Sequence, residues 1–565
     1  MLNYIKNFFN TNISFLILLI IVVLSLYGKS ICFELTGLDD DILITKNINF
    51  ISDYKNIPKL FTTSAFYNNT TLYYRPVLSL SFALESFFVR DNLKFYHITN
   101  IILFILSLYL LYLFCMELKL NSVITKFVLL IMAVHPMFSS VIVWLPGRND
   151  SLLTVFFVLS FIFFIKYINT QKIKFAVLFC LFFIVSLFTK ETFIMLIPLY
   201  FIGLYFCECK IAGKKLITLC TVLIPFVVLF FILRKCSVAS FSLEYYISNA
   251  GILFKTFIKD SFIYFYNFFV PENIPTILFN AKLNLSIIVC NCFLIGVLFF
   301  VIYKRILPYK IIIFSILFVF LSIFPTFLQK EDVYLNHRFF ICSVGFIIFI
   351  VSLFNYLVSK FNKLKSVFIM LFCVCFVCLC ILSYKQADKY KNYETFWINA
   401  YNDSPQYHVT NQHLSHVYIN RNDMEKAKYY AEKAVNLKSS FATVIDYAAV
   451  LMIIGDLDRA EFAFLEIEKD IKGSKNLLYY PLSEIYYKKQ DYKKALEYAL
   501  KAYDIKPYDI DYCKQLIKIY HVSGNYIDEL KIYEKLSGFD KNNKEYKNKI
   551  NELKEKINSK ETQNA

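Results

Sequence analysis

The sequence predicts an all-α protein of two parts, a polytopic transmembrane helical domain followed by a soluble α-solenoid of repeated helix pairs. The 565-residue chain is 58% hydrophobic and 19% aromatic, and long apolar stretches recur from residue 13 to residue 383. Basic residues fall in the short connections between these stretches. Beyond about residue 385 the chain becomes polar, and small residues recur with a period of about 34.

The apolar stretches predict about eleven membrane-spanning helices, since a helix needs about 20 apolar residues to cross the hydrocarbon core. The first stretch follows Lys6 and has no small-residue cleavage site behind it, so we expect a retained span. The expected spans are 12–31, 98–118, 123–143, 151–168, 174–189, 192–207, 215–233, 283–303, 310–328, 339–358 and 366–383. A further apolar stretch, 251–270, is expected to dip into the membrane surface.

Charges between the spans predict the orientation of the chain. Five short connections are basic, as the positive-inside rule expects of cytoplasmic loops. They contain Lys119 and Lys126; Lys166, Lys172 and Lys174; Lys210, Lys214 and Lys215; Lys304, Arg305 and Lys310; and Lys360, Lys363 and Lys365. The opposite face receives the loop 32–97 and everything after residue 384. We expect a multi-pass protein of the plasma (inner) membrane, with the repeats on the extracytoplasmic face. The net charge of +17 does not indicate a nucleic-acid partner.

Residues 385–540 carry the repeat. At one position in the second helix of the repeat, three of the four units have a small residue. The four residues at this position are Ala427, Ala460, Ala495 and Glu529. The preceding turn holds Asn422, Gly455, Gln490 and Gly524, and the first helix of each unit places Tyr418, Leu451, Tyr486 and Tyr520 at one site. This pattern resembles the tetratricopeptide repeat, in which small residues let paired helices approach. We expect about four units after a half-unit, and a charged capping helix or tail over 541–565; an unrelated helical bundle is the alternative.

Polar residues gather in the connections of the predicted outer face. In chain order they are Asp39-Asp40-Asp41, Tyr73-Tyr74-Arg75-Pro76, Tyr96-His97, His135-Pro136, Gly147-Arg148-Asn149-Asp150, Lys190-Glu191 and His337-Arg338. With the spans and the repeats, this ordered set resembles the transmembrane and tetratricopeptide-repeat-containing proteins, a branch of the GT-C glycosyltransferases related to protein O-mannosyltransferases. The resemblance covers nearly the whole chain and implies a GT-C-like domain over 1–384. It implies transfer of a sugar, usually mannose, from a polyprenyl phosphate on the non-cytoplasmic face.

Displacement of a lipid phosphate from an anomeric carbon needs a base for the acceptor hydroxyl and cations for the leaving phosphate. Asp40, with Asp39 beside it, is the candidate base, and by resemblance Asp40 corresponds to the family's catalytic loop acid. Arg148, Arg338 and Arg75 are candidates for the phosphate, because a guanidinium meets its oxygens with two parallel hydrogen bonds. Candidates for a supporting role are His97, His135, Lys190, Glu191 and His337. Direct displacement inverts the anomeric carbon, and the repeats favour Ser or Thr of a protein as the acceptor.

Structural alternatives stand beside these roles. The aspartates at 39–41 could be a solvated helix start, and arginines near span ends are often interfacial. His97, Asn100 and His135 could bond between helices, and Lys190 and Glu191 could neutralise each other. The sequence has no ligand spacing that requires a cofactor, although oxygens of Asp39, Asp40 and Glu191 could hold a divalent metal. Two other functions remain, a membrane-anchored repeat scaffold and a transporter of lipid-linked saccharides.

Overall fold

The computed structural model describes residues 12–67, 71–206, 213–238, 243–279, 281–325, 333–470, 476–507, 509–539 and 543–564. The chain folds into two compact units, residues 1–404 and residues 405–565. Helices make up nearly all the regular structure of the described residues, as the sequence predicts. We describe each unit separately and refer to them as the first and the second unit.

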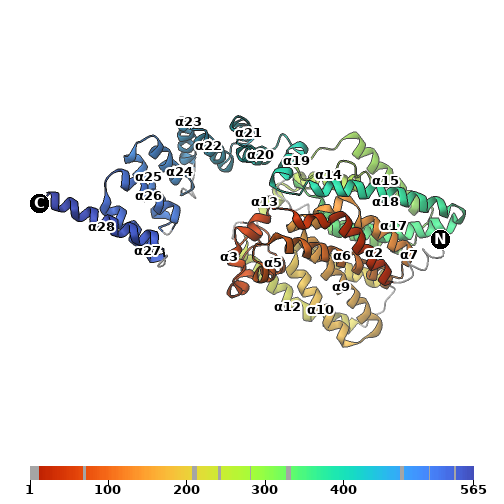
Figure 1. Ribbon diagram of the computed structural model, residues 1–565. Helices are drawn as coiled ribbons and strands as arrows, with labels where there is room; N and C mark the ends of the chain where they lie inside the picture. Colours follow the sequence, from red (N-terminus) through yellow and green to blue (C-terminus); the bar gives the residue numbers. More distant parts are fainter. Residues whose placement is uncertain are drawn as a thin grey trace. The chain divides into compact units, whose positions relative to one another are not determined.

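Among the described residues of the first unit, seven helical stretches are long and apolar enough to cross a membrane. They are Asn12–Cys32, Leu93–Glu117, Leu145–Thr170, Ile217–Ser237, Leu285–Tyr303, Asn336–Lys360 and Ser366–Asp388. Their main helices are α2 (Asn12–Tyr27), α6 (Leu93–Glu117), α9 (Arg148–Thr170), α12 (Gly213–Ser237), α15 (Leu285–Tyr303), α17 (Phe339–Lys360) and α18 (Lys365–Asp388). In Figure 1, α2, α6 and α9 have nearly parallel axes, and the chain runs through α2 in the opposite sense to α6 and α9.

The remaining predicted spans are helical but broken or short. Helix α7 (Ser122–Ala133) and the following segment η4–α8 (Pro136–Val143) meet at an angle of 61°, and the bend coincides with His135 and Pro136. The other three predicted spans become α10 (Ile173–Thr189), η6 (Glu191–Leu196) with α11 (Pro198–Phe206), and α16 (Tyr309–Ile323). At about 1.5 Å per residue, a helix of 15 to 17 residues is about 25 Å long, short of the hydrocarbon thickness. The prediction of about eleven spans is therefore not confirmed, and seven or at most eight candidates remain.

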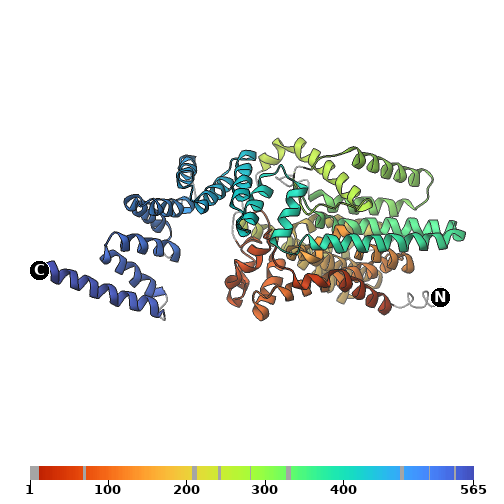
Figure 2. The same cartoon turned by 45° about the horizontal axis from the view of Figure 1, so that its top comes forward.

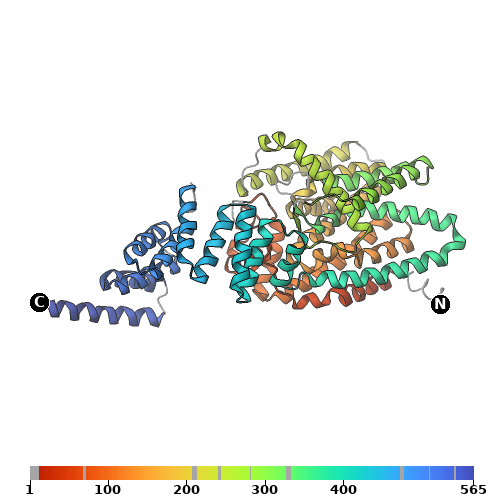
Figure 3. The same cartoon turned by 90° about the horizontal axis from the view of Figure 1, so that it is seen from above.

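Short elements gather at one end of the first unit. They include η1 (Gly28–Cys32), the π-helix η2 (Asp41–Thr45), α3 (Ile48–Ile51), η3 (Tyr54–Asn56), α4 (Ile57–Leu60), α5 (Pro76–Val89), η5 (Leu145–Gly147), α13 (Leu243–Ser248), η8 (Asn336–Arg338) and α19 (Tyr393–Asp403). Figure 1 places α3, α5, α13 and α19 toward the same end. The turn between α17 and α18, which contains η9 (Asn362–Leu364), lies at the other end with the start of α2 (Figures 2 and 3). The residues of the predicted outer loops are thus grouped together.

Two segments close this end of the unit. Helix α14 (Ala250–Phe269), which fills the predicted surface stretch, leads into β1 (Leu278–Phe279). Strand β1 pairs antiparallel with β2 (Val333–Tyr334), so that Leu278 faces Tyr334 and Phe279 faces Val333. Strand β2 immediately precedes η8. The pair therefore fixes the segment that carries His337 and Arg338.

The boundary between the units lies at residues 404 and 405, about twenty residues beyond the predicted boundary at 384 and 385. Helix α18 continues to Asp388, and α19 is bonded to the first unit at both ends. The indole of Trp397 donates to the carbonyl of Thr36 (3.0 Å), and the Asp403 carboxylate accepts from the backbone of Thr276 (2.6 Å). Helix α19, which the sequence predicts as a half-repeat, is part of the first unit because its hydrogen bonds reach the loops of that unit.

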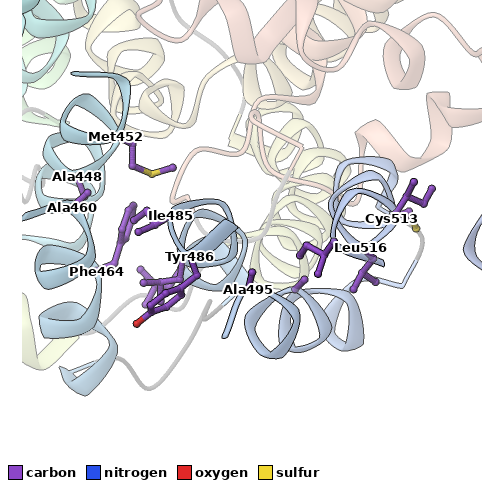
Figure 4. Close-up of a cluster of buried hydrophobic side chains, with 14 of the residues drawn as sticks. Ala448, Met452, Ala460, Phe464, Ile485, Tyr486, Ala495, Cys513 and Leu516 are labelled. Atoms are coloured by element: carbon purple, nitrogen blue, oxygen red, sulfur yellow. The ribbon is translucent and has the colours of Figure 1, made fainter. Parts of the chain in front are cut away.

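The second unit consists of four helix pairs and a last helix. The pairs are α20 (His408–Asn420) with α21 (Met424–Leu437), α22 (Phe441–Ile454) with α23 (Leu457–Asp470), α24 (Asn476–Lys488) with α25 (Tyr492–Ile505), and α26 (Ile510–Val522) with α27 (Tyr526–Phe539). Helix α28 (Lys544–Asn564) follows, as expected of a capping helix. Figure 4 shows small residues such as Ala448, Ala460 and Ala495 among larger side chains of the buried core.

The predicted repeat register is confirmed. Ala427, Ala460 and Ala495 are fully buried, where they let the two helices of each pair approach. The four predicted turn residues all have left-handed backbones: Asn422 (φ 58°), Gly455 (φ 90°), Gln490 (φ 64°) and Gly524 (φ 68°). A left-handed residue after a helix ends it and reverses the chain. The sequence period therefore reports the turn position of every unit.

Candidate active site at the helix ends

Five charged or titratable side chains from four separate segments meet at the grouped end of the first unit. We call Arg75, Asp150, Lys190, Glu191 and His337 the polar cluster. The Lys190 ammonium lies 2.7 Å from one oxygen of Asp150, and the His337 Nε2 lies 4.0 Å from the other. Arg75 pairs with Glu191, the neighbour of Lys190 in the chain. The predicted outer loops therefore converge into one site.

The pair of Lys190 and Asp150 joins the ends of two neighbouring helices. Asp150 lies in the first turn of α9, where a carboxylate is favoured by the helix dipole, and Lys190 follows the last residue of α10, where a cation is favoured. Asp150 is 1% exposed and Lys190 is 7% exposed. A buried charge is tolerated only when paired, so the pair depends on both partners. The ring of His337 packs beside it against Trp144, with ring centroids 5.1 Å apart.

Arg75 uses both sides of its guanidinium in the cluster. Its Nε and Nη2 each lie 3.2 Å from an oxygen of Glu191, which is a bidentate arrangement. The ring of Tyr73 lies 4.4 Å from the guanidinium carbon. The side chains of Arg75 and Glu191 are 19% and 22% exposed. Unlike the pair of Lys190 and Asp150, this pair is thus reached by solvent.

The three consecutive aspartates have three different surroundings. Asp40 is 1% exposed, and its carboxylate accepts from the backbone N–H (2.7 Å) and hydroxyl (2.8 Å) of Thr36 and the backbone N–H groups of Gly37 (2.9 Å) and Asp41 (3.0 Å). Burial raises the pKa of Asp40 to about 7, while the donors from Thr36 favour its charged form. Asp41 pairs with Lys46 at 2.5 Å. The Asp40 carboxylate therefore organises the loop, and the Asp41 carboxylate is neutralised near solvent.

Asp39 is the aspartate that remains open. Its backbone is left-handed (φ 70°), its side chain is partly exposed, and within the described chain its carboxylate accepts no hydrogen bond. Loss of solvent around the carboxyl raises the pKa of Asp39 to about 6, and the nearby charges of Arg75 and Arg338 act in the opposite direction. The charges of Arg75, a member of the polar cluster, and of Arg338 therefore both act on Asp39.

Arg338 borders the cluster on the η8 side. Its Nη1 donates to the carbonyl of Val333 (2.7 Å) in β2, and its charge acts on Asp39. The strand pair β1–β2 thus positions this guanidinium. Arg75 and Arg338, two of the three predicted phosphate-binding arginines, lie near Asp39.

Arg148 has a different place. It is 0% exposed, its Nη1 pairs with Glu85 (2.8 Å), and its Nε donates to the side-chain oxygen of Asn100 (2.7 Å). Its Nη2 donates to the carbonyl of Tyr96 (2.8 Å), and its guanidinium lies over the ring of Phe82. All three nitrogens are occupied inside the protein. These contacts give Arg148 a structural role outside the polar cluster, and its predicted contact with a donor phosphate stays a prediction.

Two predicted histidines also lie outside the polar cluster. The ring of His135 accepts from the backbone of Met137 (3.2 Å), bonds the carbonyl of Phe268 (2.9 Å), and stacks on the Phe268 ring. It thereby caps the start of η4 at the bend, which corrects its predicted supporting role. His97 is 1% exposed, and its ring packs edge-on against Phe33. Neither ring nitrogen of His97 has a hydrogen-bond partner among the described residues.

Two of the three carboxylates named for a bound metal have other partners. Asp40 uses its oxygens for the loop and Glu191 uses its oxygens for Arg75. Over the described ranges, no three His, Cys, Asp or Glu side chains gather as a metal-binding set.

Asp150 and Trp144 belong to the site but were not among the predicted site residues. The signal for Asp150 was its position just before an apolar stretch, since an acid at the start of a helix is favoured there. The side chain of Asn149 lies beside it, and one amide orientation lets its oxygen accept from Arg75 (3.3 Å) and its nitrogen donate to Thr189 (3.0 Å). No sequence signal points to Trp144.

Comparison with known proteins identifies the repeats. The tetratricopeptide repeat family model matches residues 410–441 and 478–509, which cover the helix pairs α20–α21 and α24–α25. Both segments lie in the second unit. No curated protein sequence is significantly similar to the chain. The chain thus contains tetratricopeptide repeats, beside a unit whose helices include seven that could cross a membrane.

Proposed function

We propose that the first unit transfers a sugar from a polyprenyl phosphate to a hydroxyl acceptor, with Asp39 as the general base. The observation that carries this proposal is an open carboxylate, Asp39, in a loop that Trp144 joins to His337, the neighbour of Arg338, at the end of a bundle of apolar helices. A lipid-linked phosphate presents its charged group at such a boundary while its tail stays in an apolar layer. The sugar, usually mannose in the family that the sequence resembles, the prenyl carrier, and a Ser or Thr of a protein as acceptor belong to the proposal.

Asp39 suits the base better than Asp40 does. A base needs an oxygen that can reach the acceptor hydroxyl, and the oxygens of Asp40 already accept four hydrogen bonds. Asp39 is partly exposed and accepts none from the described chain. With a pKa near 6, its carboxylate is mostly ionised at neutral pH and still basic enough to accept a proton.

The step balances without a cofactor. The acceptor oxygen forms a bond to the anomeric carbon and gives its proton to Asp39. The bond from that carbon to the phosphate oxygen breaks, and the phosphate leaves with the electron pair. Because attack and departure occur on opposite faces, the anomeric carbon inverts.

Two arginines would hold the leaving phosphate. The charge of Arg338 acts on Asp39, and Arg75 can exchange the solvent-reached carboxylate of Glu191 for phosphate oxygens. Lys190 is committed to Asp150, so its role is to position the cluster. An apolar cavity of about 150 Å³ between α9, α10, α11 and α12, lined by residues such as Phe179, Tyr200 and Leu223, is consistent with a lipid tail among the helices.

A membrane-anchored scaffold is the second candidate function. The observation that favours it is the family match, which identifies the repeats and so an established kind of protein-binding module. This function predicts that the repeats alone keep the biological role. It also predicts that Asp39 can be exchanged without consequence.

The test is radiolabel transfer from polyprenyl phosphate mannose in membranes that contain the wild type, Asp39→Asn or Asp41→Asn. Products are sorted into protein, lipid and polymer. We expect transfer by the wild type and by Asp41→Asn, which changes a neighbouring carboxylate already paired with Lys46. Asp39→Asn should lose on the order of 10²- to 10⁴-fold. Full transfer by Asp39→Asn would contradict the base, and no transfer by the wild type from a panel of prenyl phosphate sugars would favour the scaffold.

A further inference from the structure

Both tryptophans of the chain bind the same loop. The sequence has two tryptophans in 565 residues. The indole of Trp144 donates to the carbonyl of Leu38 (3.0 Å), and the indole of Trp397 donates to the carbonyl of Thr36 (3.0 Å). They are 5% and 0% exposed. The two carbonyls are separated by one residue, and Asp39 follows directly.

The loop between these carbonyls is packed closely against the start of α19. Gly37 has a left-handed backbone (φ 73°), and a Cβ atom there would lie 2.6 Å from the ring of Tyr393. The N–H of Glu34 donates to the carbonyl of Lys391 (2.9 Å), just before α19. Helix α19 and its approach thus cover the loop from one side through a hydrogen bond at residue 34, a ring at residue 37 and an indole at residue 36.

The same helix also holds the segment that leads to Arg338. At the other end of α19, Asp403 accepts from the N–H of Thr276 (2.6 Å), and the Ser404 hydroxyl accepts from the N–H of Phe279 (2.9 Å). Phe279 pairs with Val333, whose carbonyl accepts from Arg338. A continuous set of hydrogen bonds therefore runs from the aspartate loop through α19 and β1 to the arginine.

Trp144 provides a second connection between the loop and the segment that carries Arg338. Its ring packs on His337, the neighbour of Arg338, while its N–H holds Leu38. The two indoles thus tie the loop to two segments that lie 106 and 361 residues away along the chain. Local hydrogen bonds of Asp40 complete the loop but do not fix its position against these distant segments.

We propose that Trp144 and Trp397 are positioning residues that hold the backbone of the loop, and with it the Asp39 carboxylate, at a fixed place relative to η8, which carries Arg338. The catalytic consequence rests on the proposed function, in which Asp39 is the base. Neither indole touches the reacting atoms in this account. A displacement of about 1 Å at a catalytic group costs on the order of 10²-fold in rate, so the effect should fall on kcat and leave donor KM nearly unchanged.

The test uses the purified full-length protein in lipid nanodiscs and compares Trp397→Phe with Tyr112→Phe. Phenylalanine keeps an aromatic ring but removes the indole donor. Tyr112→Phe is the matched control, because it also removes one aromatic donor, to Asn12 (2.7 Å), near the start of α2. Hydrogen exchange is followed in peptides that cover residues 33–43, and kcat and KM are measured with polyprenyl phosphate mannose.

We expect Trp397→Phe to speed exchange in the loop at least about tenfold and to lower kcat on the order of 10²-fold, with donor KM changed less than about twofold. Tyr112→Phe should change none of the three. Unchanged loop exchange in Trp397→Phe would overturn the inference, as would faster exchange with wild-type kcat. If the wild type transfers no sugar, the proposed function fails, and exchange alone decides: faster exchange confined to the loop upholds the fixed position, and unchanged exchange refutes it.

Discussion

Two ion pairs of equal length, one in each unit, have opposite surroundings. Lys190 and Asp150 in the first unit are 2.7 Å apart with side chains 9% and 2% exposed. Lys501 and Glu497 in the repeats are also 2.7 Å apart, but their side chains are 41% and 58% exposed. A buried partner cannot turn to water when the other is lost, whereas an exposed one can. The distance between charges therefore says little about their importance, and burial decides it.

The two regions also differ in how far their contacts reach along the chain. Arg75 and Glu191 are 116 residues apart, and Trp397 and Thr36 are 361 residues apart. In the second unit each helix packs mainly on its neighbours in the sequence, as in other stacked repeats. The site is thus sensitive to changes in several distant segments, and a repeat is sensitive mainly to changes within it and its neighbours.

The largest difference in the free energy of unfolding is expected between Lys190→Met and Lys501→Met. Loss of Lys190 leaves the buried Asp150 carboxylate uncompensated and should lower the free energy of unfolding of the first unit by about 3 to 5 kcal/mol. Loss of Lys501 removes an exposed i,i+4 pair and should cost about 0.3 to 0.5 kcal/mol. Thermal unfolding of the purified full-length variants measures both. Equal shifts would show that burial does not separate the two regions as described.

A second prediction separates two arginines within the first unit. Arg148→Lys keeps the charge but cannot reproduce bonds to Glu85, Asn100 and the Tyr96 carbonyl, so the unit should lose about 2 to 3 kcal/mol. Arg75→Lys, at the solvent-reached pair, should shift unfolding less and should raise the KM for the prenyl phosphate donor. Unfolding curves and donor KM for both variants check this. An unchanged unfolding curve for Arg148→Lys would show that Arg148 does not have the structural role described here.

A smaller contrast is expected between two left-handed glycines. Gly37→Ala strains the backbone and places a methyl group 2.6 Å from the Tyr393 ring, so we expect a cost of about 2 kcal/mol and a displaced loop. Gly455→Ala, in a repeat turn, meets no atom within 4 Å and should cost about 1 kcal/mol from backbone strain alone. Denaturant unfolding, monitored in each unit by hydrogen exchange, measures the two free-energy costs. A larger loss at Gly455 would reverse the comparison.

The sequence predicted the repeats in more detail than the site. The period gave the turn residues and the buried alanines of the second unit, because neighbouring helices repeat the same local packing. In the first unit it identified the segments that meet, including those with Arg75, Lys190 and His337. It named Asp40 as the candidate base, where we now propose Asp39, and it grouped Arg148 with Arg75 and Arg338. Those roles depend on which groups fill the space around each side chain, and these groups come from distant parts of the chain.

Helix length explains why the structure has fewer candidate spans than the sequence predicts. The apolar stretches at 173–189 and 309–323 have the composition of spans, but their helices end after 17 and 15 residues. The sequence placed the first of these ends at residue 189, where the helix does end, but it placed the second at residue 328, beyond the last residue of the α-helix, Ile323. The half-repeat predicted before the four units belongs to the first unit for a related reason, because Trp397 and Asp403 bind loops that lie far away in the sequence.

The most direct test of the account is the pH dependence of single-turnover transfer from polyprenyl phosphate mannose between pH 5 and 8, for the wild type and Asp39→Asn. The pKa of Asp39 is raised to about 6, and the base acts when deprotonated, so the wild-type rate should be constant above that pH and fall as the pH drops through 6. Asp39→Asn should be slower by on the order of 10²- to 10⁴-fold and should lack this acid limb. A wild-type rate in Asp39→Asn with the acid limb intact would contradict the account and show that another group accepts the proton.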